Sequence, residues 1–325
     1  MRFSGTLKVA AGALGAICLS MSAAAQTFPA RPLRIIVAYG PVGGPDTVSR
    51  LIAPLIGADL GQTVVIENRG GGAGMPAINE VLNSPADGHT LFVPDAGHWA
   101  ITPALQDVTY DFMRDFAPVG MVFSGPQIYV VLSSTGIKSL RELIDLAKAK
   151  PGVLNYGSPG IGSVHHLQGE VFKSGLGIDI RHVPYRGGGE MTEALLRGDV
   201  QFAFLALAAL LPHVKSGKLT MLAVSSNTRF RGAPELPTVA EVTGMADFSF
   251  LGQMGMVVKA GTPRPVIDRV SGALRKALTN QAAADRVFTT SGIELMPTTP
   301  EQFADLIRAD IAKYTRAVKV SGARP

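Results

Sequence analysis

The segment YGSPGIGSVHHLQGE, residues 156–170, follows the apolar residues Val153 and Leu154 and contains three glycines before a helix that we expect to begin near Ser163. Glycines let backbone N–H groups turn inward without a Cβ in the way. The first turn of the following helix adds unpaired donors and the positive end of a dipole. The segment therefore predicts an anion-binding loop.

The same order of strand, glycine loop and helix occurs earlier in the chain. Residues 34–39 have a strand pattern, residues 40–45 (GPVGGP) form the loop, and we expect Asp46 or Thr47 to cap the helix that follows. In open α/β sheets, ligands lie beyond the carboxyl ends of the strands, where such loops are found. If the two units belong to facing lobes, two helix N-termini converge on one ligand.

The first 25 residues have the pattern of a secretory signal peptide. A basic start precedes an apolar stretch, residues 9–21, and Ala23–Ala25 gives a small-residue cleavage site. We therefore expect cleavage after Ala25 and a periplasmic mature protein. The one cysteine, Cys18, lies in this segment, so the mature chain has no thiol, disulfide or cysteine metal ligand.

The formal net charge of the chain is small. The chain has 30 basic and 25 acidic residues, and removal of the signal peptide takes away two basic residues, which lowers the formal net charge from +5 to +3. Basic residues are dispersed and not interleaved with aromatics, which disfavours nucleic-acid binding. The longest later apolar run, residues 202–211, is about half as long as a membrane span.

The pattern of the rest of the chain predicts an α/β fold, because strand-like runs alternate with helical ones. Capping-box spacing predicts helix starts at Ser139 and Thr299, and the last helix is expected over about 300–319. The strand-like runs are Leu33 to Ala38, Val64 to Ile66, Thr90 to Val93, Ile128 to Leu132, Leu219 to Val224 and Met254 to Lys259.

Neither glycine motif matches a nucleotide site. Residues 157–163 have P-loop spacing, but Ser163 stands where the phosphate-binding lysine is needed. A tight turn that only glycine can adopt is the structural alternative at this loop. Residues 72–77 match the dinucleotide motif G-x-G-x-x-A, yet five residues separate them from the preceding strand and Pro76 interrupts the expected helix.

The chain also lacks a recognisable catalytic set. It contains no G-x-S-x-G pentapeptide, which a serine hydrolase of this fold class needs. The adjacent His165 and His166 point about 100° apart on a helix and cannot share a metal ion. No pair of carboxylates suggests an acid and a base. We therefore expect a binding protein without a metal or cofactor, and not an enzyme.

The ordered motifs of the mature chain resemble those of the Bug-type periplasmic solute-binding proteins of tripartite tricarboxylate transporters. The motifs are RPLRIIVAY (31–39) with Asp46 and Arg50, GQTVVIENRGGGAG (61–74), DGHTLF (87–92), YDFMRDFAPVG (110–120), NYGSPGIGSVHHLQGE (155–170), HVPYRGGGE (182–190), SGKLTMLAVSS (216–226), LPTVAEV (236–242) and AGTPRPVIDRV (260–270).

The resemblance implies a two-lobed Venus-flytrap fold of type II, with residues 26–124 and 251–325 in lobe 1 and residues 125–250 in lobe 2. It also implies a monomer that delivers a small carboxylate to a membrane permease. Backbone N–H groups and water in three loops are expected to hold the carboxylate. The expected residues in these loops are Tyr39, Gly43, Gly44, Asp46, Thr47, Ser158, Gly160, Gly162, Ser163, His165, Tyr185 and Gly187.

Two departures from the family pattern bear on the ligand. Val42 replaces the first glycine of the family's first loop, and Leu205 and Ala206 follow a strand after which many members have Asp or Asn. An apolar wall favours a dicarboxylate or aromatic carboxylate with an apolar middle. His98, Trp99 and Tyr39 are candidates to line it, and Leu205 could instead lie in the core.

Two other functions remain open at this point. An exported hydrolase or esterase would be recognised by the formation of product. A ligand sensor for a signalling kinase would have no distinguishing feature in this sequence.

Overall fold

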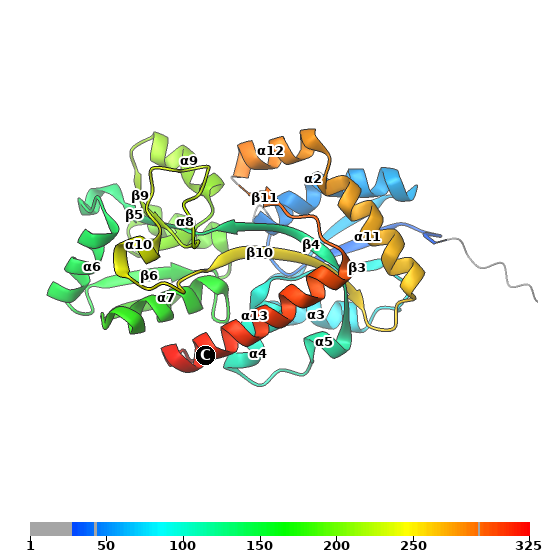
Figure 1. Ribbon diagram of the computed structural model, residues 1–325, viewed down its shortest axis with the longest axis horizontal. Helices are drawn as coiled ribbons and strands as arrows, with labels where there is room; N and C mark the ends of the chain where they lie inside the picture. Colours follow the sequence, from blue (N-terminus) through cyan, green and yellow to red (C-terminus); the bar gives the residue numbers. More distant parts are fainter. Residues whose placement is uncertain (1–27, 42–43, 292) are drawn as a thin grey trace, which may run out of the picture.

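The computed structural model describes residues 28–41, 44–291 and 293–325, which form two sheets covered by helices (Figure 1). In the described residues, the first sheet has the strand order β11 (Glu294–Leu295), β4 (Phe116–Pro126), β10 (Leu251–Lys259), β3 (Thr90–Val93), β1 (Leu33–Val37) and β2 (Val64–Asn68). The second has the order β7 (Ile180–Pro184), β6 (Leu154–Ser158), β8 (Phe202–Leu205), β5 (Ile128–Leu132) and β9 (Leu219–Val224).

Each sheet contains parallel strands whose carboxyl ends lead into glycine loops. In the first sheet β1 pairs in parallel with β2 and β3, and in the second β6 pairs in parallel with β7 and β8. The chain continues from β1 into α2 (Gly44–Leu60) and from β6 into α7 (Val164–Leu176). The two strand, loop and helix units therefore belong to different sheets.

Two long strands connect the sheets. β4 and β10 pair antiparallel from Phe116 with Lys259 to Pro126 with Leu251. Only Gln127 separates the end of β4 from β5 of the second sheet, and Phe250 precedes β10 on the return. Figure 1 shows β4 and β10 side by side between the lobes, so both crossings lie together.

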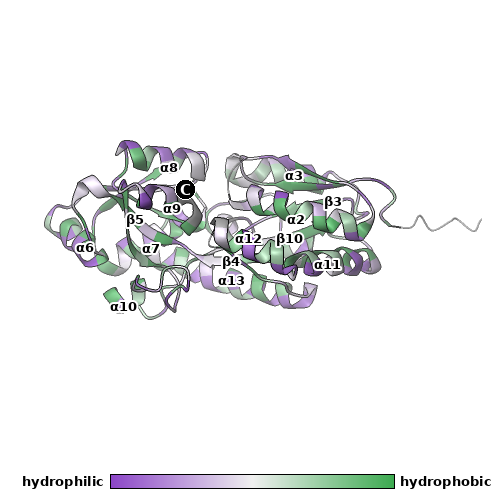
Figure 2. Ribbon diagram, turned by 90° about the horizontal axis from the view of Figure 1, so that it is seen from above, coloured by the Kyte–Doolittle hydropathy of each residue, from purple (hydrophilic) through white to green (hydrophobic). Residues whose placement is uncertain are grey.

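The helices divide between the lobes, which lie end to end in the view of Figure 2. Around the first sheet, the described residues form α3 (Met75–Leu82), α4 (Thr102–Leu105), α5 (Phe112–Asp115), α11 (Arg264–Leu278) and α12 (Gln281–Ser291), with short turns η1 (Gly72–Gly74) and η2 (Gly97–Ile101). Around the second sheet they form η3 (Ser133–Thr135), α6 (Leu140–Ala149), α8 (Gly188–Arg197), α9 (Leu207–Lys215) and α10 (Val239–Thr243).

The last helix, α13 (Pro300–Ser321), packs on both lobes. Thr299 and Gln302 form a reciprocal capping box at its start, as their spacing predicts. Its buried Phe303 lies against Gly255 of β10, where a Cβ would come within 1.9 Å of the ring. The same helix contacts β4 and η2 of the first lobe and α7 of the second.

The predicted two-lobed α/β fold is confirmed, with two local corrections. α2 begins at Gly44, two residues before the caps that we expected. His98 and Trp99, where the sequence pattern predicted neither a helix nor a strand, lie in the π-helical turn η2. In the described part of the chain, no helix combines the length and apolar character needed to cross a membrane.

Candidate ligand-binding cleft

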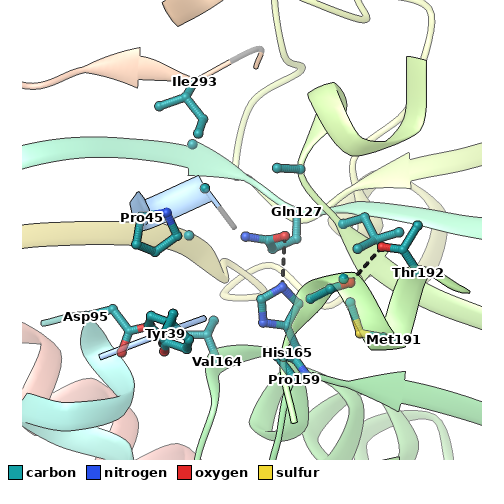
Figure 3. Close-up of a pocket in the computed structure, with 18 of the residues that line it drawn as sticks. Tyr39, Pro45, Asp95, Gln127, Pro159, Val164, His165, Met191, Thr192 and Ile293 are labelled. Atoms are coloured by element: carbon teal, nitrogen blue, oxygen red, sulfur yellow. Dashed lines mark hydrogen bonds between the residues drawn. The ribbon is translucent and has the colours of Figure 1, made fainter. Parts of the chain in front are cut away.

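A cavity of about 430 Å³ lies between the lobes, and we call it the first cavity (Figure 3). Gln127, at the crossing between the sheets, and Gln253 of β10 contribute to its lining. The rest of the lining comes from both lobes and the strand that joins them: Tyr39, Gly40, Pro41, Gly44, Pro45, Asp95, Phe123, Gly252 and Ile293 from the first lobe, Gly125 and Pro126 from the end of β4, and Pro159, Val164, His165, Arg186 to Thr192 and Leu205 to Leu207 from the second lobe.

Four helices direct their N-terminal turns at the first cavity. They are α2 through Gly44 and Pro45, α7 through Val164 and His165, α8 through residues 187–190, and α9 through Ala206 and Leu207. Each helix N-terminus carries about half a positive charge and unpaired N–H donors. These four turns therefore bring backbone donors and partial positive charge to the cavity wall, beside the side chains of Asp95, Arg186 and Glu190.

The N-terminus of α8 is the most open of the four. Its first residues, Gly188 and Gly189, have no Cβ and an ideal Cβ there would meet nothing within 4 Å. Their N–H groups have no hydrogen-bond partner in the described part of the chain. Gly187, the cap residue, supplies no side-chain hydrogen bond. These donors are free to bind an anion in the cavity.

His165 is the central polar side chain of the cavity. Its Nε2 lies 3.1 Å from Oε1 of Gln127, a contact drawn in Figure 3. Burial lowers the pKa of His165 to about 4, although the carboxylate of Asp95 opposes the effect. The imidazole is therefore neutral at pH 7 and can offer one hydrogen-bond donor and one acceptor.

The remaining wall is largely apolar. Leu205 and Leu207 follow β8, Met191 comes from α8, and Phe123 and Ile293 come from the first lobe. Leu205 is buried in a hydrophobic cluster and also lines the cavity, so both of the roles that the sequence left open apply to it. This wall suits an apolar ligand body.

The carboxylate of Asp95, which lines the first cavity, is held by hydrogen bonds within the first lobe. Its carboxylate accepts hydrogen bonds from Tyr39 Oη and from the N–H of Gly97, and Nδ1 of His98 lies 2.7 Å from its Oδ1. Burial alone raises the pKa of Asp95, but His98 and the other donors lower it below its usual value. The carboxylate therefore stays ionised, with its charge satisfied by these three partners.

A second cavity, of about 500 Å³, adjoins the first. Tyr39, Pro159 and Arg186 line both cavities. The other residues of the second cavity are Ala38, Gly71 to Gly74, Gly97, His98, Thr102, Leu105, Gln106, Gly160 to Ser163, Pro184, Tyr185 and Pro325. The segment at residues 156–170 therefore contributes to two cavities. Val164 and His165 line the first, and Gly160 to Ser163 line the second.

The expected site residues fall into three groups. Tyr39, Gly44, His165, Gly187 and Leu205 line the first cavity, and Tyr39, His98, Gly160, Gly162, Ser163 and Tyr185 line the second. Ser158, Asp46 and Thr47 line neither cavity. Gly43, like Val42, lies outside the described residues.

Ser158 and Asp46, which line neither cavity, form hydrogen bonds with neighbouring groups of the protein. Ser158 Oγ lies 2.7 Å from Nε2 of His182 and 3.1 Å from the N–H of Gly160, so it braces the glycine loop from behind. Asp46 is buried and accepts hydrogen bonds from Arg50 and Asn68. Trp99 is 1% exposed and donates from Nε1 to Asp310 at 3.1 Å, which places it in the core.

Sequence reasoning placed Tyr185 and Gly187 in the site without expecting that the helix α8 begins there, and it missed the N-terminus of α9 and the side chain of Gln127. The three consecutive glycines at 187–189 were the available signal for α8. No comparable signal existed for α9, whose cap residue Ala206 has no polar side chain. In the described residues, no group of three His, Cys, Asp or Glu side chains is arranged to hold a metal ion.

Two α/β lobes joined by a pair of crossing strands, with an anion-favouring cleft between them, define the class of two-lobed solute-binding proteins. The family model of the tripartite tricarboxylate transporter family receptor matches residues 48–322. The chain belongs to this family of receptors.

Relatives cover almost the whole chain. Protein BugT of Bordetella pertussis is 32% identical over 305 residues, which is 92% of each chain. A Rhodopseudomonas palustris protein solved with adipate superimposes with a TM-score of 0.86 at 29% identity, covering 92% of this chain and 99% of that one. MatC from the same organism, solved with bound malate, gives a TM-score of 0.83 at 27% identity, covering 90% and 100%.

Proposed function

We propose that this receptor binds a small carboxylate in the first cavity and delivers it to the membrane subunits of a tripartite tricarboxylate transporter. The observation that carries the proposal is the convergence of four helix N-termini on one cavity. Such a site binds carboxylates through backbone donors and the helix dipoles. The adipate and malate present in two similar structures support this ligand class.

The apolar wall of the cavity further restricts the class of carboxylate that can bind. Leu205, Phe123 and Ile293 offer no hydrogen bond to a ligand hydroxyl or amine buried against them. A polar group there would lose its bonds to water without replacement. We propose a dicarboxylate or an aromatic carboxylate whose middle part is apolar.

The proposal includes the organisation of the mature protein. Cleavage after Ala25 releases a periplasmic monomer whose lobe 1 is residues 26–124 and 251–325 and whose lobe 2 is residues 125–250. The change from the first sheet to the second at Gln127, and the return at Phe250, support these boundaries. The protein binds its ligand without turnover and works as a receptor rather than as an enzyme.

A thermal-unfolding screen of the mature protein tests the proposal. At a hundred times Kd, one bound ligand adds about 2.7 kcal/mol to the free energy of unfolding. We expect a rise in melting temperature with aliphatic or aromatic carboxylates and recovery of the unchanged ligand afterwards. A shift with sugars or amino acids but with no carboxylate contradicts the proposal. Conversion of carboxylate esters into products would favour the exported esterase instead.

A further inference from the structure

The second cavity has a wall of unpaired backbone donors. Gly71, Gly72, Ala73 and Gly74 have φ values of 90°, 53°, 52° and 81°. The N–H groups of the first three have no hydrogen-bond partner in the described part of the chain. Ala73 adopts a left-handed conformation that costs free energy for a residue with a Cβ. This exposed turn lines the cavity and brings unpaired donors to its wall without any charged side chain.

His98 adds a polar side chain to the same wall. The residue is 3% exposed, and its Nδ1 lies 2.7 Å from the carboxylate of Asp95, which can only accept a hydrogen bond. The backbone nitrogen of Asp95 also lies 3.2 Å from Nδ1, so both hydrogen-bond contacts of the ring use Nδ1, and Nε2 has no partner among the described residues. Nε2 faces the cavity beside Gly74, where a Cβ would come within 2.2 Å of it. Since no described residue bonds to Nε2, this nitrogen is available to a ligand.

Arg186 supplies an unpaired cation at the junction of the two cavities. It lines both of them. Its backbone N–H donates to Glu190, but its guanidinium forms no hydrogen bond or ion pair with any described residue. A guanidinium binds a carboxylate through two parallel hydrogen bonds. Arg186 can therefore reach an acidic group that lies beyond the first cavity.

We propose that the second cavity receives the second acidic group of a dicarboxylate whose first carboxylate lies in the first cavity. This inference rests on the proposed function. The apolar middle of the ligand passes Tyr39 and Pro159, which line both cavities. Arg186 pairs with the second carboxylate, and the turn at residues 71–73 donates backbone hydrogen bonds to it.

Calorimetric titration with chain-matched acids tests this inference. Hexanoate with adipate, octanoate with suberate, and benzoate with terephthalate each differ by one carboxylate. In the Arg186→Gln protein we expect the affinity for the dicarboxylate to fall about 10- to 100-fold, the range for a lost hydrogen bond to a charged group. The affinity for the monocarboxylate is expected to stay within about threefold.

Arg181→Gln is the matched control. Arg181 is exposed on β7 of the same lobe and lines neither cavity, so its loss removes the same charge without removing a contact. The variant should bind both kinds of acid as the unsubstituted protein does. His98→Gln is a second variant, and it should also weaken dicarboxylates selectively.

The outcomes separate this inference from the proposed function. Equal affinity of the unsubstituted protein for mono- and dicarboxylates overturns the inference and leaves the receptor function intact. An equal loss for both acids in Arg186→Gln also overturns it, because Arg186 would then act on the first carboxylate or on the general potential. Absence of binding by every acid in the series contradicts the proposed function itself.

Discussion

At the scale of single residues, burial sets the charge of the groups around the cleft. His165 is held neutral, with its pKa lowered to about 4 by burial. His182, behind the glycine loop, has its pKa lowered to about 3 by burial and by the neighbouring His166 and Lys173. Neither imidazole gains a proton between pH 6 and 8. These two residues therefore do not change the charge of the binding cleft between pH 6 and 8.

The negative charge of Asp310 lowers the free energy of unfolding, because the carboxylate is buried. Burial raises its pKa to about 6, although the hydrogen bond from Trp99 and the charge of Lys313 oppose the rise. Because the folded pKa lies above the unfolded value, the protonated form stabilises the fold below about pH 4. This contribution is lost as the pH rises through 6.

Asp310→Asn keeps an acceptor for Trp99 and removes the charge. We expect the variant to be more stable than the unsubstituted protein by about 1 to 2 kcal/mol at pH 7.5, since each pKa unit corresponds to about 1.4 kcal/mol. The difference should vanish at pH 4. Thermal unfolding of both proteins at the two pH values measures it, and a gain of the same size at pH 4 would refute the role of the charge.

At the scale of elements, the N-terminal turn of α8 allows a clean test of the anion site. Gly189 is exposed, its Cβ position is open and its φ lies outside the left-handed region. An aspartate at this first turn favours the helix through its dipole, but it places a negative charge beside the cavity. We expect Gly189→Asp to fold normally and to bind carboxylates at least tenfold more weakly.

Gly189→Asn is the neutral control of almost the same shape. It should retain carboxylate affinity within about threefold, as calorimetric titration would show. Equal weakening by the two substitutions would mean that side-chain volume, rather than charge, disturbs the site.

The elements themselves were predicted well where one local signal sufficed. Ser163 caps α7, and Thr299 and Gln302 cap α13, because a short polar side chain bonds to the backbone three residues on. The runs at 90–93, 128–132 and 219–224 match β3, β5 and β9. Continuous apolar runs of that length give buried strands when turn residues bound them.

The site was predicted in part, for reasons that are also physical. The loops at residues 39–47 and 156–165 could be found because glycines and caps mark them in the sequence. The start of α9 carries no such mark, and the contact of Gln127 with His165 depends on how the crossing strands place two distant residues. The division of one glycine loop between two cavities is a property of the assembled lobes.

At the scale of the whole molecule, the lobes touch across the cleft through small residues. Gly162 of the second lobe has φ of 80°, and a Cβ there would come within 2.5 Å of Thr102 Oγ1 in the first lobe. The carbonyl oxygen of Gly162 also lies 3.1 Å from an ideal Cβ at Gly97. This close approach requires glycine at both positions. A larger residue at 162 would hold the lobes apart.

Gly162→Ala should therefore weaken ligand binding by impeding this approach, and its positive φ should also cost stability. Thr102→Gly in the same chain removes the colliding atom. We expect the double variant to recover most of the ligand affinity while staying less stable than the unsubstituted protein. Calorimetric titration and thermal unfolding measure the two effects separately. No recovery of affinity would mean that backbone strain, rather than lobe contact, caused the loss.

The central claim is that helix N-termini in the first cavity hold a carboxylate by its charge. Titration calorimetry of the mature protein with the carboxylate that gives the largest thermal shift, and with the primary amide of the same acid, tests it most directly. The amide keeps the shape and the apolar body but lacks the charge. We predict at least a hundredfold weaker binding of the amide, and equal affinity for the two compounds would contradict the account.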